Sequence, residues 1–193
     1  MTPTSVSLLD RLKVARSDAP EWKQFEVMYL PLIRRWVSRI PGLGSEVDDV
    51  TQEVLLVLVR EIPRFERQRL GSFRAWLRQV TVNRVRVYRR QHFRQPAMVG
   101  DQTDGFLDQI ADSNNVLAQQ FDQEHDKHIC ATLLTSVRPD FNQETWDAFQ
   151  QFALEGRPAS DVARELNTSV NAVIKAKARV LNRLREEAGG FLE

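Results

Sequence analysis

Apolar residues in the N-terminal half of the chain recur every three or four positions, which is the spacing of one buried face of an α-helix. The first such series contains Pro31, which predicts a kink, and is ended by Pro41 and Gly42. A second helix is predicted over residues 46–62, where Pro63 stops it. The apolar positions of these two helices are Trp22, Phe25, Met28, Tyr29, Leu32, Ile33 and Trp36 in the first and Val50, Val54, Leu58 and Ile62 in the second.

A third, longer helix is predicted to begin at Ser72, which suits an N-cap, and to run to residue 94. Its expected inward stripe is Phe73, Trp76, Leu77, Val80 and Val87. Residues 95–115 contain Pro96 and Gly100 but few periodic apolar positions, so they are predicted to form a flexible linker. Helices resume at Val116.

The C-terminal residues 116–193 carry the spacing of a helix-turn-helix. Asn167 tolerates the left-handed turn conformation, and Ser169 suits the cap of the helix that follows. The apolar positions on either side of this turn are Val162, Ala163 and Leu166 before it and Val170, Val173, Ala176, Val180 and Leu184 after it. A purely structural helical hairpin is the alternative. The predicted fold class is therefore all-α, with two small helical domains joined by a flexible linker and a helix-turn-helix in the C-terminal one.

Charge is sorted by segment, although the formal net charge is only +1. Nine arginines and no carboxylate lie between Glu66 and Asp101, interleaved with aromatic residues, and residues 168–185 hold five further cations without a carboxylate. Acidic residues gather instead at 46–53 and at 101–126. Arginine neutralises phosphates and stacks on bases, so the basic segments favour nucleic acid, with a solvated helix face as the alternative.

The composition and motifs of the chain argue against several classes of protein, namely secreted, membrane-spanning, enzymatic and metal-binding proteins. A chain of 193 residues with one cysteine, Cys130, has no internal disulfide and fits a reducing cytosol. Neither a signal peptide nor an apolar run long enough for a membrane span is present, so a soluble cytoplasmic protein is expected. No catalytic motif or cofactor loop occurs, so we expect no enzyme and no cofactor. His125 and His128 lie near Cys130, but without a second ligand pair no metal site is predicted.

Three segments together resemble the bacterial extracytoplasmic-function sigma factors, compact two-domain proteins that direct RNA polymerase to promoters. The segment 48–54 reads DDVTQEV, and 71–77 reads GSFRAWL and is followed by Asn83 and by Arg89 and Arg90. The third segment is 161–185, which spans the helix-turn-helix. Val87 departs from the family pattern, which often has an aspartate there. The segment through Leu9, with YLPL at 29–32, resembles a subgroup seen in planctomycetes.

The resemblance implies three interfaces and a domain division. Residues 1–94 resemble sigma region 2, 95–115 form an acidic linker, and 116–193 resemble sigma region 4. The second helix is expected to bind the clamp helices of core RNA polymerase through Asp48, Asp49, Gln52 and Glu53. Acidic and amide side chains suit a basic partner helix, although Asp48 and Asp49 also favour a helix N-terminus for purely structural reasons.

The two DNA interfaces follow from the same resemblance. The loop before the long helix is expected to capture a flipped base of the minus-ten element, and the helix face after it to follow the separated strand. The residues assigned to this role are Arg67, Gln68, Arg69, Arg74, Arg78, Asn83, Arg86 and Arg90, whereas Trp76 is assigned to the core rather than to base stacking. The second helix of the helix-turn-helix is expected to enter the major groove of the minus-thirty-five element. Its candidates are Asn171, Lys175 and Arg179 for base edges and Thr168, Ser169, Lys177 and Arg183 for phosphates.

Expected partners are core RNA polymerase and promoter DNA, with an anti-sigma factor or another regulator as a further candidate. Two other classes remain open. An autonomous helix-turn-helix regulator would bind duplex DNA without polymerase, and a helical adaptor would bind only protein. The aromatic arginine segment argues against the first, and the acid-free basic segments argue against the second.

Overall fold

A computed structural model describes residues 8–16, 18–66, 72–92 and 102–188, and every regular element within these ranges is helical. The chain divides into two compact units, Leu8–Ile129 and Cys130–Leu192, each of which is described by itself. Over the described ranges, no helix combines the length and the apolar character that crossing a bilayer requires. The all-α prediction is therefore confirmed.

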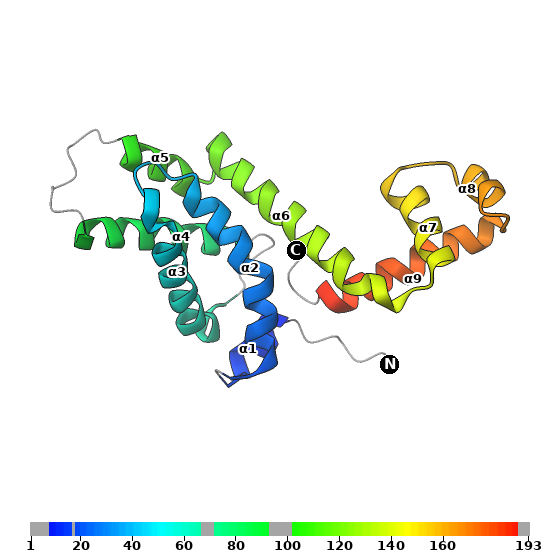
Figure 1. Ribbon diagram of the computed structural model, residues 1–193, viewed down its shortest axis with the longest axis horizontal. Coiled ribbons are helices and arrows are strands. Elements are labelled where there is room, and N and C mark those ends of the chain that lie inside the picture. Colours follow the sequence, from blue (N-terminus) through cyan, green and yellow to red (C-terminus); the bar gives the residue numbers. More distant parts are fainter. Residues whose placement is uncertain (1–7, 17, 67–71, 93–101, 189–193) are drawn as a thin grey trace. The chain divides into compact units, whose positions relative to one another are not determined.

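The N-terminal unit is built around α2 (Pro20–Ser38), α3 (Val47–Glu61) and α4 (Ser72–His92), which pack in sequence, α2 on α3 and α3 on α4 (Figure 1). These helices confirm three predicted elements. The turn after α2 contains Gly42 at φ +79° and Gly44 at φ +48°, a backbone region that favours glycine. α1 (Leu8–Val14), which the sequence analysis did not predict, buries three leucines.

Aromatic side chains tie the helices of this unit together. Phe25 and Tyr29 of α2 stack with centroids 4.5 Å apart, and Phe73 of α4 meets the Tyr29 ring edge-on at 5.6 Å. Trp36 lies 5.3 Å from Phe121, centroid to centroid, and both rings are buried. Because aromatic pairs add to the free energy gained by burying their area, this cluster holds the positions of α2 and α4 firmly.

The buried stripe of α4 differs from the predicted one. Val80 and Val87 are only half-buried, whereas Val82, Val85 and Tyr88 are buried. Thr81 is buried as well, because its hydroxyl donates to the carbonyl oxygen of Leu77 at 2.9 Å and so needs no other partner. Because the Thr81 hydroxyl has its partner within α4, Thr81 can face the core. The buried face of α4 therefore lies to one side of the face that was predicted through Val80 and Val87.

The predicted flexible linker contains a helix, α5 (Gln102–Ala111), which packs against α4. Three residues on one face, Thr103, Leu107 and Ile110, are buried, and the Thr103 hydroxyl donates to the carbonyl oxygen of Pro41 at 3.2 Å. Gly105 and the scarcity of apolar residues hid this helix from a periodicity argument, because one short face with three anchors gives a weak signal.

The following helix, α6 (Val116–Val137), begins where helices were predicted to resume. Asn115 caps it by accepting a hydrogen bond from the backbone nitrogen of Leu117 at 2.9 Å. The division between the two units falls inside α6, after Ile129, and not in residues 95–115. The part of α6 up to Ile129 therefore completes the N-terminal unit, burying Ala118, Phe121 and Ile129 there.

The C-terminal unit contains α7 (Gln143–Phe149), α8 (Ala159–Glu165) and α9 (Val170–Ala188), with α7 and α8 packed on α9. The turn between α8 and α9 holds Asn167 at φ 51°, and the Ser169 hydroxyl oxygen accepts from the backbone nitrogen of Ala172 at 3.1 Å. Both roles were predicted. The core of the unit is Ala148, Val162, Ala163, Val173 and Ala176. Two residues predicted to lie in the core do not, because Val170 is exposed and Leu184 is half-buried.

Candidate nucleic-acid and protein interfaces

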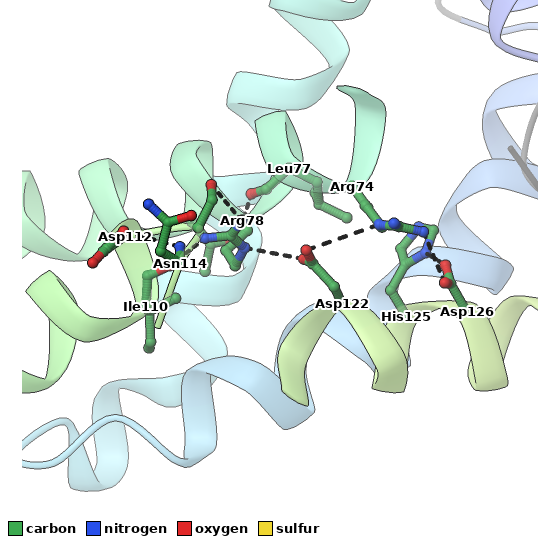
Figure 2. A network of polar contacts seen from close by, with 11 residues as sticks. Arg74, Leu77, Arg78, Ile110, Asp112, Asn114, Asp122, His125 and Asp126 are labelled. Carbon is green, nitrogen blue, oxygen red and sulfur yellow. Dashed lines mark hydrogen bonds and ion pairs between the residues drawn. The ribbon is translucent and has the colours of Figure 1, made fainter. Parts of the chain in front are cut away.

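The arginine side of α4 meets carboxylates of the chain itself. Arg78 is 1% exposed, and its guanidinium donates to Asp122 Oδ1 at 3.1 Å, to Ser113 Oγ at 3.2 Å and to the carbonyl oxygen of Ile110. Figure 2 shows Asp122 between Arg78 and Arg74, with Arg74 3.9 Å from Asp122 and 2.8 Å from Asp126. The structure thus places Arg78, predicted to follow a DNA strand, inside a network of polar contacts.

The remaining α4 residues assigned to the minus-ten element differ in exposure. Arg86 pairs with Asp108, and the neighbouring Arg89 pairs with Asp104 at 2.9 Å. Asn83 and Arg90 are exposed. Arg67, Gln68 and Arg69, which were predicted to bind the same element, lie outside the described residues. Only part of the predicted strand-binding face is therefore open in this structure.

Trp76 is neither fully buried in the core nor fully exposed for stacking on a base. Its ring is half-buried and lies 4.9 Å from the Phe65 ring and 5.5 Å from the Phe73 ring, centroid to centroid. Phe73 is buried and anchors the group. The three rings form an aromatic cluster at the start of α4, and Trp76 leaves part of its surface accessible there.

His125 lies beside the arginine network and links α6 to α2. Its Nδ1 is 3.1 Å from Asp126 Oδ1 and its Nε2 is 3.4 Å from the Tyr29 hydroxyl (Figure 2 shows the Asp126 contact). A carboxylate only accepts, so Nδ1 carries the proton and Nε2 accepts from Tyr29. Burial lowers the pKa of His125, and the Asp126 contact opposes this shift in part. His128 instead contacts the carbonyl oxygen of Met28 at 2.7 Å, so the two histidines have separate partners.

The outer face of α3 contains the residues predicted to bind polymerase. Two of them are paired with arginines of the chain, and the other two are exposed. Asp48 pairs with Arg34 at 2.6 Å, which lowers the pKa of Asp48, and Glu53 accepts from Arg84 at 2.6 Å. Asp49 and Gln52 are exposed and share a stripe with Leu56 and Val59, which are 68% and 40% exposed. These two apolar residues were not among the predicted site residues, although their i+4 and i+7 spacing from Gln52 places them on the same helix face.

Glu46, just before α3, reaches the end of α4. Its carboxylate accepts a hydrogen bond from the Tyr88 hydroxyl, which raises the pKa of Tyr88 to about 12. This contact and the Arg84 to Glu53 pair fix α3 on α4 by polar contacts at two places. The exposed α3 stripe of Asp49, Gln52, Leu56 and Val59 is therefore presented by a rigid support.

The basic face of α9 is open. Lys175 and Arg179 are exposed, and no carboxylate of the described residues lies within ion-pair distance of either. Asn171, Thr168 and Ser169 are exposed next to them. All five were predicted to contact DNA, and the structure brings them together at the turn and along the first half of α9.

Two further cations of α9 are engaged within the C-terminal unit. Lys177 Nζ lies 4.9 Å from the centroid of the Phe152 ring. Arg183 pairs with Asp140 at 2.7 Å and with Glu187 at 2.9 Å, contacts that raise the pKa of Arg183. These two residues are therefore less available for phosphates than Lys175 and Arg179.

Residues 27–95 match the family model of Sigma-70 region 2, a stretch that includes most of α2 and all of α3 and α4. No curated protein matches the chain. The chain therefore contains a Sigma-70 region 2 domain, which indicates binding to RNA polymerase and recognition of the minus-ten promoter element. The match supports a role of residues 27–95 in transcription initiation.

Proposed function

We propose that the chain is an extracytoplasmic-function sigma factor that binds core RNA polymerase, recognises both promoter elements and assists strand opening. The observation that carries the proposal is the match to Sigma-70 region 2, followed along the chain by a separate unit with a helix-turn-helix and an open basic face. A sigma factor needs both parts, one to hold polymerase and the minus-ten element and one to hold the upstream element. The proposal places the protein in the cytoplasm with polymerase, and the planctomycete-type subgroup remains part of it.

In this proposal the α3 stripe binds polymerase. Asp49 and Gln52 supply acidic and amide groups, and Leu56 and Val59 supply apolar area that water covers in the free protein. Charge complementarity to a basic partner helix guides association, while the desolvated apolar centre supplies most of the binding energy. Asp48 and Glu53, already paired with arginines, contribute less.

The DNA contacts are divided between the two units. Asn171, Lys175 and Arg179 read base edges upstream, and Thr168 and Ser169 hold phosphates. The loop with Arg67, Gln68 and Arg69, together with Asn83 and Arg90, serves the minus-ten element. A premelted promoter distinguishes these roles, because it rescues a variant that fails in strand opening but not one that fails in upstream binding.

The α3 stripe gives the sharpest test. The double variant Asp49→Lys with Leu56→Arg should weaken binding to core polymerase at least about tenfold, because like charges facing one another across an interface cost several kcal/mol. Asp49 lies in the first turn of α3, so its reversal should lower the free energy of unfolding by about 1 kcal/mol through the helix dipole, whereas Leu56→Arg, at an exposed site, should change it by no more than about 0.5 kcal/mol. Glu155→Lys, an exposed reversal in the other unit, is the matched control.

The readouts are affinity for purified core polymerase and transcription from mapped start sites. Loss of both in the double variant, with the control unchanged, supports the proposal. Wild-type chain that fails to bind core polymerase would contradict it and favour an autonomous helix-turn-helix regulator or a protein adaptor. An anti-sigma factor or other regulator remains a proposed partner and is not needed for this result.

A further inference from the structure

The acidic segment of the N-terminal unit follows the arginine side of α4 in antiparallel order. Asp104 pairs with Arg89 and Asp108 with Arg86, and Asp122 then contacts Arg78 and Arg74. Asp126 ends the series on Arg74. As the number of the aspartate rises, the number of the arginine falls, so the carboxylates lie along the arginines as a row of phosphates would.

The two ends of this series are anchored very differently. At the α6 end, Arg78 is almost fully buried, and Phe121 next to Asp122 packs on Trp36. At the α5 end, the Asp108 side chain is 73% exposed, whereas that of Asp104, at 42%, is about as exposed as that of Asp126 on α6, at 47%. Exposed ion pairs contribute little to stability and weaken as salt rises, so the Arg86 to Asp108 pair is the one most readily exchanged for another anion, while the buried Arg78 keeps Asp122 in place.

α5 is held on α4 by three buried side chains and by polar contacts. Its buried side chains are those of Thr103, Leu107 and Ile110, and Arg78 binds the carbonyl oxygen of Ile110 near its C-terminal end. The turns that carry Asp104 and Asp108 are held by the buried Thr103 and Leu107 as well as by the two ion pairs. Asp108 is therefore the most exposed carboxylate of the series.

We propose that α5 is an internal competitor of nucleic acid, a carboxylate cover that occupies Arg86 and Arg89 in the free protein and yields them to a single-stranded polyanion. The inference rests on the proposed function, because it takes the α4 face as the surface along which the separated promoter strand runs. Its consequence is that the free chain binds single strands weakly, since the arginines are already neutralised. Arg90, exposed beside them, gives an incoming strand its first contact.

The test uses the full chain without polymerase and a fluorescent single-stranded DNA of mixed sequence. Asp104→Asn with Asp108→Asn removes both exposed carboxylates of the cover. Affinity should rise at least about tenfold, and the salt slope should steepen by about 1.4, since each newly neutralised phosphate of a single strand adds about 0.7. Asp18→Asn with Glu26→Gln removes the same charge from an exposed part of the same unit and should leave both quantities close to wild type.

A second pair of variants separates the possible failures. Adding Arg86→Gln and Arg89→Gln to the Asp104 and Asp108 variant should abolish its gain. One outcome is that Asp104→Asn with Asp108→Asn does not raise the affinity for single-stranded DNA, while Arg86→Gln with Arg89→Gln still impairs core-dependent transcription. The proposed role of α5 as a cover is then refuted, and the proposed function stands. If the two arginine substitutions change neither strand binding nor transcription, the assignment of this α4 face to DNA is itself refuted.

A separate observation on α9 carries a second inference. Val170, Ile174 and Ala178, spaced four residues apart, form an apolar row on the exposed side of the helix, with Val170 44% and Ile174 50% exposed. The row adjoins a polar row of Asn171, Lys175 and Arg179, which has the same spacing. Aliphatic side chains between cations do not suit a purely solvated face, and they do not contact phosphates.

We infer that Ile174 reads a thymine methyl group in the major groove. The thymine 5-methyl is the apolar group that a base pair presents there, and the adjoining row of Asn171, Lys175 and Arg179 carries the donors proposed for the neighbouring base edges. The inference deepens the proposed upstream recognition and depends on it. Val170 and Ala178 extend the same apolar contact along the groove.

The test begins with a duplex selected by the chain bound to core polymerase. Replacing single upstream thymines by deoxyuridine removes one methyl group, and at one position affinity should fall about fourfold, the value of one buried methyl-sized group. Ile174→Ala should lose the same amount on thymine DNA and be insensitive to deoxyuridine, whereas Leu154→Ala, another exposed apolar residue of this unit, should behave as wild type. A deoxyuridine effect that persists in Ile174→Ala, or that is absent in wild type, overturns the inference, whereas failure to select any upstream element overturns the proposed function.

Discussion

The arginine side of α4 and the basic face of α9 have similar composition and opposite surroundings. On α4, Arg74, Arg78, Arg86 and Arg89 each contact an aspartate from residues 104–126. On α9, Lys175 and Arg179 are exposed and lie beyond ion-pair distance of every described carboxylate. A run of cations in a sequence therefore does not tell how many of them are available to a polyanion, because a distant acidic segment can fold onto them.

The largest expected difference between the two faces is in stability. Arg78→Met should lower the free energy of unfolding by roughly 3–5 kcal/mol, because it leaves Asp122 and the carbonyl oxygen of Ile110 without their buried partner. Lys175→Met, on the open face, should change it by no more than about 0.5 kcal/mol. Urea unfolding followed by circular dichroism measures both. Equal effects of the two substitutions would contradict the contrast between a structural and a free cation.

An effect of comparable size is expected for DNA binding by the open face. Lys175→Ala with Arg179→Ala should weaken upstream promoter binding by the polymerase complex, with each lost base contact contributing roughly 1–3 kcal/mol. Arg183→Ala is the matched control, because Arg183 is held by Asp140 and Glu187. The measurement is a binding titration on a duplex promoter. If Arg183→Ala is as damaging as the double variant, ion pairing within the unit does not restrict the use of these cations.

The smallest effect concerns pH at the junction of α2, α4 and α6. Burial lowers the pKa of His125 below that of the unfolded chain, so the unfolded state binds more protons as pH falls toward and below about 6.5, and the folded state loses stability there. Asp122, Asp126, Arg74 and the Tyr29 hydroxyl face this ring. His125→Gln should lose part of the difference in urea midpoint between pH 7.5 and pH 5.5. An unchanged difference would show that His125 stays neutral in both states or is not protected by burial.

Much of the fold follows from the sequence because strong periodic patterns mark long helices. The apolar series of α2 and α3, with their proline and glycine ends, gave elements close to those in the structure. The turn at Asn167 and the cap at Ser169 were predictable because their chemistry is local. α5 was not predictable, because its three anchors include a threonine whose partner, Pro41, is distant in sequence.

The site was predicted less completely for the same physical reason. Exposure of Asp49, Gln52 and Lys175 follows from helix phase, which the sequence contains. The burial of Arg78 does not, because it depends on groups at residues 110, 113 and 122. Long-range pairing of opposite charges leaves no periodic signal, so the sequence showed two oppositely charged segments without showing that they lie together.

The most direct test of the whole account compares the chain alone with the chain bound to core polymerase on the same promoter duplex at physiological salt. With α4 largely neutralised and α9 offering a small open face, the isolated chain should bind only in the non-specific range of about 10⁻⁴ to 10⁻⁶ M. Core polymerase holds both units on one promoter, which makes the second contact effectively intramolecular, so tight and sequence-specific binding should appear only in the complex. Nanomolar, sequence-specific binding by the isolated chain would contradict the account and favour an autonomous regulator.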